Sequence, residues 1–320
     1  VLYLNFNETV DGVEAIAKVK LAEKSAECVR HYDKRDDISV DRLKKLAVGD
    51  AVINACGELL SYRPSWGMLV GVRPSKVATE LLMSGMSKTK VKKILVSDYF
   101  VIPKKAALAT EVALNEAKIV GTPDKKDCSV YISIPFCPTI CAYCSFVSYT
   151  SKKLLSTIPQ YIERLTGEIE GIFSFIRKRG LNLKTVYIGG GTPTILDESL
   201  LCILLDAVAK NTDIQSLEEY TLECGRPDTI NEEKLKIAKE HGVNRISVNP
   251  QILNDDVLRK IGRAHNSEEF LRAYDIARNS GIPIINTDVI AGLPGDKFQT
   301  FSASFDKVLS LRPENITVHT

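Results

Sequence analysis

The sequence has few histidines and no long apolar runs. Its 320 residues include four histidines and one tryptophan. No apolar run approaches the roughly 18 residues that cross a bilayer, so we expect no membrane span, and no secretory leader is visible. The net charge is only +2, which makes nucleic acid an unlikely partner. The chain begins at Val1 rather than Met, so we expect a fragment or a processed form.

Cysteine is the most informative residue type that the chain does contain. There are eight cysteines, and three of them are clustered. Without a secretory leader, they suit a reducing interior better than a disulfide framework, so we expect a cytoplasmic protein. The apolar fraction of 44% supports ordinary buried cores, and the length is sufficient for two domains.

The clustered cysteines are Cys137, Cys141 and Cys144, at spacing C-x3-C-x2-C. Four-iron clusters normally take four cysteine ligands, so three leave one iron open to a small molecule. A structural zinc site would need a fourth Cys or His close by, and the nearest histidine along the chain, His241, lies far downstream. Three unrelated buried thiols are the other alternative. The spacing favours an iron–sulfur cluster.

Residues 1–126 predict a small α+β accessory domain. The run at 1–6 alternates like a strand, and helical patterns follow. The basic cluster at 88–93 is interpreted as a solvated helix face, because no aromatic residues are interleaved with it. A polar stretch rich in turn formers at 121–127 gives the expected boundary. The predicted helices are 12–26, 41–60, 76–84 and 88–97.

Residues 127–320 alternate between strand and helix patterns. Such alternation predicts a parallel sheet that curls into part of a barrel, with reacting groups at the carboxyl ends of the strands. The predicted strands are 129–135, 185–188, 220–223, 245–249, 284–290 and 315–319. The predicted helices are 158–176, 199–209, 232–240, 255–261, 267–280 and 297–311.

Candidate ligand-binding residues follow successive predicted strands. The cysteine loop comes after the first strand, and Tyr143 within it could pack on a ligand or shield the cluster. Three consecutive glycines end at Gly191, before Thr192, after the second strand. Glycine lets backbone groups approach a ligand without side-chain obstruction, so Gly190 and Gly191 are candidates, although a turn without a ligand is an alternative.

The later strands each contribute a polar residue. Glu223 ends the third strand and could accept hydrogen bonds from ribose hydroxyls. Gln251 follows the fourth strand, Arg263 could bind a carboxylate bidentately, and Asp288 lies near the end of the fifth. Each alone is more often an ordinary polar residue, and their shared location is what singles them out.

These motifs together resemble a known family. The matching runs are Tyr131-x-x-Ile-Pro-Phe-Cys, Gly-Gly-Gly-Thr-Pro-Thr, the Glu223 strand, Gln251 with Arg263 twelve residues on, and Asp288 before Gly-Leu-Pro-Gly. From about residue 129 to 320 the chain resembles the radical S-adenosylmethionine (SAM) proteins of the oxygen-independent coproporphyrinogen III oxidase type, the HemN-like family. The segment Val-Gly-Val-Arg-Pro-Ser at 70–75 is similar to the HemZ branch.

The resemblance implies a fold, two cofactors and a set of site residues. It implies an α/β fold, a (β/α)6 partial barrel at 127–320 with a further C-terminal domain absent from this chain. It also implies a small-molecule substrate, a porphyrinogen, and an electron donor such as flavodoxin or ferredoxin. By the resemblance, Cys137, Cys141 and Cys144 bind a 4Fe-4S cluster, and the residues near SAM are Tyr131, Tyr143, Gly190, Gly191, Thr192, Glu223, Gln251, Arg263 and Asp288.

Two departures bear on the activity that the resemblance implies. The oxidase has a fourth cysteine where this chain has Phe146, and a histidine where it has Ser133. A phenylalanine at the first position is shared with HemW-type haem chaperones. The leading hypothesis is oxidative decarboxylation of coproporphyrinogen III to protoporphyrinogen IX. A haem chaperone and a radical SAM enzyme for another substrate are the alternatives, and no catalytic side chain is assigned.

Overall fold

The structure is a computed structural model that describes residues 1–36, 38–121 and 124–320. The chain forms two units, Val1–Pro123 and Asp124–Thr320, each with its own internal contacts. Among the described residues, no helix combines the length and the apolar character that crossing a membrane requires. The proposed division into domains at residue 126 stays a prediction.

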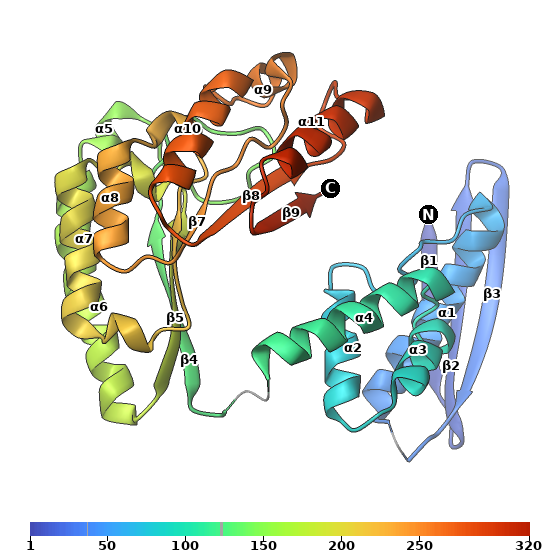
Figure 1. Ribbon diagram of the computed structural model, residues 1–320. Helices are drawn as coiled ribbons and strands as arrows, with labels where there is room; N and C mark the ends of the chain where they lie inside the picture. Colours follow the sequence, from blue (N-terminus) through green and yellow to red (C-terminus); the bar gives the residue numbers. More distant parts are fainter. Residues whose placement is uncertain (37, 122–123) are drawn as a thin grey trace. The chain divides into compact units, whose positions relative to one another are not determined.

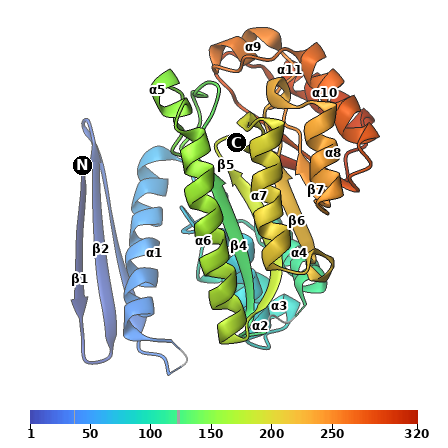
Figure 2. The ribbon, with the colours of Figure 1, turned by 90° about the vertical axis from the view of Figure 1, so that its left-hand side faces the viewer.

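The first unit begins with an antiparallel sheet of β1 (Leu2–Glu8), β2 (Gly12–Leu21) and β3 (Lys24–Asp33). Helix α1 (Val40–Leu60) packs along the sheet (Figure 2). The helix predicted over 12–26 is therefore wrong. Ala, Glu and Lys favour a helix there, but Val13, Ala15 and Ala17 alternate with more exposed residues, and this period of two buries them against α1.

The rest of the first unit is a group of three helices with its own core. These are α2 (Pro74–Met83), α3 (Lys88–Ser97) and α4 (Pro103–Val120). Helix α4 was not predicted, although Pro103 at its first turn is a typical start signal. Its buried residues are Ala106, Ala109, Thr110 and Ala113, which are small and give a weak apolar pattern.

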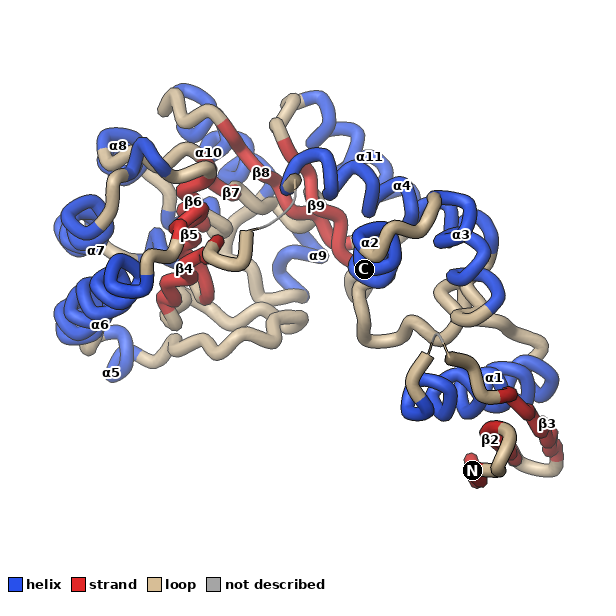
Figure 3. Tube along the Cα trace, turned by 90° about the horizontal axis from the view of Figure 1, so that it is seen from below, coloured by secondary structure: helices blue, strands red, loops and turns tan. Residues whose placement is uncertain are grey.

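The second unit is built on six parallel strands, which confirms the predicted fold class. The strands follow the chain order across the sheet, and they form a curved row in Figure 3. The sheet consists of β4 (Asp127–Ile134), β5 (Asn182–Gly190), β6 (Glu219–Glu223), β7 (Arg245–Ser247), β8 (Ile284–Ile290) and β9 (Asn315–His319).

Helices cover the outer face of this sheet, with α6, α7 and α8 side by side in Figures 1 and 2. The core beneath them is mainly aliphatic, with Ile134, Ile188 and Leu204 among its fully buried residues, and it also contains aromatic side chains such as Tyr220 and Phe270. Burial of this apolar surface is the main stabilising term for the unit. The helices are α5 (Lys152–Leu155), α6 (Ile158–Arg179), α7 (Glu198–Asn211), α8 (Glu232–Glu240), α9 (Asp255–Lys260), α10 (Ser267–Asn279) and α11 (Phe298–Ser310).

Candidate functional site

Backbone hydrogen bonds fix both ends of the cysteine loop that follows β4. At its base the amide of Cys137 donates to the carbonyl of Tyr149 at 3.1 Å, and the amide of Tyr149 donates to Pro135 at 2.8 Å. At its far side the amide of Ala142 donates to the carbonyl of Ile261 at 2.9 Å. The loop is therefore held between the end of β4 and the segment that follows α9.

The glycine turn after β5 lies directly against the start of this loop. The amide of Gly191 donates to Ile134 and that of Thr192 to Phe136, both at 2.8 Å. Gly190 has a φ of 107°, which few other residues adopt, and a Cβ on Gly191 would lie 2.6 Å from the Phe136 carbonyl oxygen. The glycines are required for this close approach of two backbones.

A cavity of about 500 Å³ opens at the carboxyl ends of the strands. Eleven of the twelve residues singled out from the sequence line it: Cys137, Cys141, Tyr143, Cys144, Gly190, Gly191, Thr192, Glu223, Gln251, Arg263 and Asp288. Tyr131 is not among the lining residues. It is 55% exposed on β4, and its ring stacks on Tyr187 with centroids 5.6 Å apart. The binding roles of all twelve residues stay predictions.

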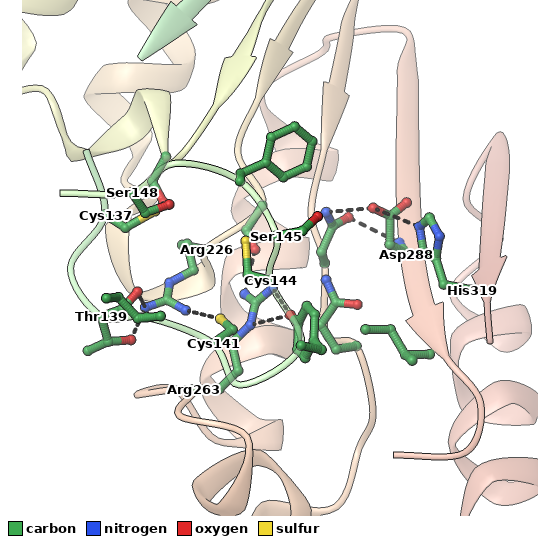
Figure 4. Close-up of a pocket in the computed structure, with 18 of the residues that line it drawn as sticks. Cys137, Thr139, Cys141, Cys144, Ser145, Ser148, Arg226, Arg263, Asp288 and His319 are labelled. Atoms are coloured by element: carbon green, nitrogen blue, oxygen red, sulfur yellow. Dashed lines mark hydrogen bonds and ion pairs between the residues drawn. The ribbon is translucent and has the colours of Figure 1, made fainter. Parts of the chain in front are cut away.

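The three clustered thiols lie on one loop and line the cavity (Figure 4). Cys137 is buried and Cys144 is exposed. They are not among the described groups whose ligand atoms all lie within 4.8 Å of one another.

The described group that does meet the 4.8 Å limit is Cys202, Asp206 and His241, on helices α7 and α8 away from the cavity. The His241 Nδ1 donates to the carbonyl of Ile237 at 2.8 Å, and its Nε2 lies 3.2 Å from the Asp206 carboxylate. These contacts tie the imidazole of His241, at the end of α8, to Asp206 on α7.

Glu223 presents a partly buried carboxylate to the cavity. One oxygen accepts from the Tyr187 hydroxyl at 2.5 Å, and the other accepts from the Gly190 amide at 3.2 Å. Burial raises the pKa of Glu223, while these two hydrogen bonds oppose the rise. Each oxygen keeps a free lone pair, so the carboxylate can still accept hydrogen bonds from a ligand's hydroxyl groups.

Gln251 is held in an unusual conformation at the cavity wall. Its φ is 63°, in the left-handed region, and its backbone pairs with that of β8, donating to Asp288 at 3.1 Å and accepting from Ile290 at 2.8 Å. Its side-chain Oε1 is buried without a hydrogen-bond partner among the described residues. A buried acceptor with no donor is costly, and a bound ligand with an N–H or O–H group would satisfy it.

Asp288 is oriented by two neighbouring amides. Asn249 donates to one carboxylate oxygen at 3.0 Å and accepts from the Asp288 amide at 3.0 Å, and Asn286 donates to the other oxygen at 2.7 Å. The His319 Nε2 lies 3.8 Å from the carboxylate. Asp288 therefore lines the cavity with its carboxyl group held in a fixed orientation.

Arg263 and Tyr143 form one contact on the opposite wall. Two guanidinium nitrogens of Arg263 donate to the Tyr143 hydroxyl at 3.2 and 2.9 Å, and a third donates to the carbonyl of Gly225 at 2.7 Å. Burial raises the pKa of Tyr143 to about 12, although the charge of Arg263 opposes the rise. The arginine therefore holds the tyrosine in place within the cysteine loop.

Arg226 and Asn249 are among the lining residues that the sequence analysis did not single out. Arg226 is 4% exposed, and its guanidinium donates to the Cys141 sulfur at 3.0 Å. Asn249 is the main partner of Asp288. Both follow a strand within three residues of its end, which is the same signal that singled out the others.

Comparison with known proteins places this site in a family context. A family model described as the radical SAM superfamily matches residues 131–308, more than half of the chain. The chain is 37% identical over 260 residues to the oxygen-independent coproporphyrinogen-III oxidase-like protein HemZ of Bacillus subtilis, covering 80% of this chain and 52% of that protein.

Two further proteins are similar to about two thirds of the chain or slightly less. The heme chaperone HemW of Bacillus subtilis is 39% identical over 193 residues, covering 60% of this chain and 49% of that protein. The structure of coproporphyrinogen III oxidase (HemN) from Escherichia coli, a radical SAM enzyme, superposes with a TM-score of 0.54 at 26% identity, covering 65% of this chain and 46% of the other. The chain spans about half the length of the curated relatives that it matches.

Proposed function

Because the chain belongs to the radical SAM superfamily, whose cofactors are a 4Fe-4S cluster and SAM, we propose that it is an oxidoreductase that decarboxylates a porphyrinogen without oxygen. The observation that carries the proposal is the meeting of three thiols and eight further predicted ligand residues in one cavity. The similarity to HemZ and HemN supports coproporphyrinogen III as the substrate.

In this proposal Cys137, Cys141 and Cys144 hold the cluster. Three thiolates suit a four-iron cluster with one iron open to a further ligand. Gly190 and Gly191 line the cavity, and the unpartnered Oε1 of Gln251 offers a hydrogen-bond acceptor in it, which fits an amino-acid ligand that carries N–H groups.

The remaining lining residues would bind and orient SAM. Glu223 would accept hydrogen bonds from its ribose hydroxyls, and the Asn249–Asp288 pair would offer a fixed anion. Arg263 would hold Tyr143 against the ligand, which keeps water from that side of the cavity. When bound, the reduced cluster and SAM supply a carbon-centred radical that can take a hydrogen atom from the substrate.

On coproporphyrinogen III the hydrogen atom would come from the β-carbon of a propionate side chain. Loss of one electron, passed to an acceptor, and of CO2 then leaves a vinyl group. Two rounds give protoporphyrinogen IX. An electron donor such as flavodoxin or ferredoxin would reduce the cluster. All eight cysteines are free, which supports the cytoplasm as the location in this proposal.

The test is anaerobic turnover of the reconstituted protein with SAM, a reductant for the cluster, coproporphyrinogen III and an added one-electron acceptor for the substrate radical. We expect methionine, 5′-deoxyadenosine and protoporphyrinogen IX, each measured by liquid chromatography and mass spectrometry. A Cys137→Ala variant is the control, and it should form none of them. SAM cleavage without protoporphyrinogen IX would eliminate the oxidase assignment.

A haem chaperone is the second candidate. The identity to HemW and the exposed Phe146 beside the last cysteine favour it. Titration of haem into the protein separates the two functions. A chaperone would bind haem tightly at a defined stoichiometry, whereas the proposed oxidase would show only weak, non-saturating binding.

A further inference from the structure

Arg226 is a buried cation directed at the cysteine loop. It lies three residues beyond the end of β6, and its side chain is 5% exposed. One guanidinium nitrogen donates to the Cys141 sulfur at 3.0 Å, and another contacts both the carbonyl, at 3.4 Å, and the hydroxyl of Thr139. Figure 4 shows these contacts between Arg226, Thr139 and Cys141.

The positive charge of Arg226 is only weakly balanced by carboxylates. Its Nε is 3.8 Å from the Asp228 carboxylate, which is beyond hydrogen-bond distance. This Nε atom has no hydrogen-bond partner among the described residues. Arginine does not lose its proton in proteins, so the charge persists in this buried position. A buried charge is costly unless an opposite charge lies close to it. The Cys141 sulfur is closer to the guanidinium than the Asp228 carboxylate is, and as a cluster ligand it would carry negative charge.

We propose that Arg226 is a positioning residue that raises the reduction potential of the cluster through Cys141. The inference rests on the proposed function, because it takes Cys141 as a cluster ligand. Reduction adds one negative charge to the cluster, so a nearby buried cation stabilises the reduced form more than the oxidised form. Hydrogen bonds to ligand sulfurs and local charge are known determinants of iron–sulfur potentials.

A purely structural role makes a different prediction. If Arg226 only held the loop through Thr139, its loss would lower the iron content but leave the potential of assembled clusters unchanged. Charge and geometry can be separated by two variants. Arg226→Met removes the charge and keeps an unbranched apolar chain, whereas Arg226→Lys keeps the charge and loses the planar fork.

The experiment is a redox titration of anaerobically reconstituted protein without SAM, followed by electron paramagnetic resonance. At a fixed solution potential we expect the ratio of reduced to oxidised cluster in Arg226→Met to fall at least tenfold, a shift of 59 mV to lower potential for one electron. Arg226→Lys should shift less. The matched control is Arg245→Met, at the amino end of β7, where the arginine pairs with Glu219 at 3.0 Å. Its potential should equal that of the wild type.

The outcomes separate the proposal from the function on which it rests. A wild type without iron and sulfide would overturn the proposed function. A wild type with a cluster and an Arg226→Met variant of unchanged potential would overturn only this inference. If Arg226→Met assembles no cluster, the lysine variant decides, because a shift of 59 mV with the charge retained contradicts an electrostatic effect.

Discussion

Replacing Gly191 by alanine tests the close approach of the glycine turn and the cysteine loop. The added Cβ would lie 2.6 Å from the Phe136 carbonyl oxygen and 2.9 Å from that of Ile134. The first distance is 0.8 Å short of the 3.4 Å at which ordinary contact begins, and both neighbours are backbone atoms that cannot rotate away. Overpacking of this kind costs about 1–3 kcal/mol. At about 2 kcal/mol per molar urea, the unfolding midpoint falls by roughly 0.5–1.5 M.

The matched control is Gly171→Ala on α6. A Cβ on Gly171 meets nothing within 4 Å, and the position is exposed, so alanine should stabilise the helix by about 0.5–1 kcal/mol. Hydrogen exchange of peptides from β4 and β5 across a urea series reports the midpoint for this unit alone. A Gly191→Ala midpoint equal to or above that of the wild type would refute the packing argument.

Two further predictions concern Glu223 and His265. Glu223→Gln should weaken SAM binding about 10- to 100-fold by equilibrium dialysis, because hydrogen bonds to a charged acceptor are worth about 1.5–3 kcal/mol. Burial raises the pKa of Glu223 above its ordinary value of 4.5, so the affinity of the wild type for SAM should begin to fall at a pH above 4.5 as the solution is acidified. A Glu223→Gln variant with the same pH dependence would contradict the assignment. His265 is 2% exposed, and burial, with the charge of Arg263 adding to it, lowers its pKa from 6.5 to about 4. The unfolded chain therefore binds the proton first, and about 3 kcal/mol of stability should be lost as pH falls from 6.5 to 4. In urea titrations, His265→Gln should flatten the dependence of the unfolding free energy on pH, whereas replacement of the exposed His31 by glutamine should leave it unchanged. If the unfolding free energy changes equally with pH in both variants, His265 is excluded as the cause.

The second unit could be predicted well because its elements are strongly patterned. Strand β8 at Ile284–Ile290 and helix α8 at Glu232–Glu240 have the predicted bounds. Buried parallel strands are nearly continuous apolar runs, and polar segments separate them from amphipathic helices. The order of these elements is sufficient to place the residues that follow each strand at one edge of the sheet.

The first unit could not be predicted in the same way. Residues 12–26 contain good helix formers, yet pairing with β1 and β3 determines a strand there. Helix α4 buries small alanines, so its period is hard to detect. In both cases tertiary contacts outweigh local preference.

The sequence also does not show which residues near the strand ends turn into the cavity. Arg226 and Asn249 have the same signal as Glu223 and Gln251, and only the backbone path after each strand directs their side chains. Tyr131 shows the opposite case, because its position on β4 places it on the open face of the sheet, beside Tyr187.

The central claim is that three thiols hold a four-iron cluster with one iron open to SAM. Its most direct test is electron paramagnetic resonance of the anaerobically reconstituted, reduced protein, recorded with and without SAM and accompanied by iron and sulfide analysis. We predict one four-iron cluster per chain, a spectrum that changes when SAM is added, and loss of the cluster in Cys141→Ala. A spectrum that does not change when SAM is added, or an intact cluster in the Cys141→Ala variant, would contradict the account.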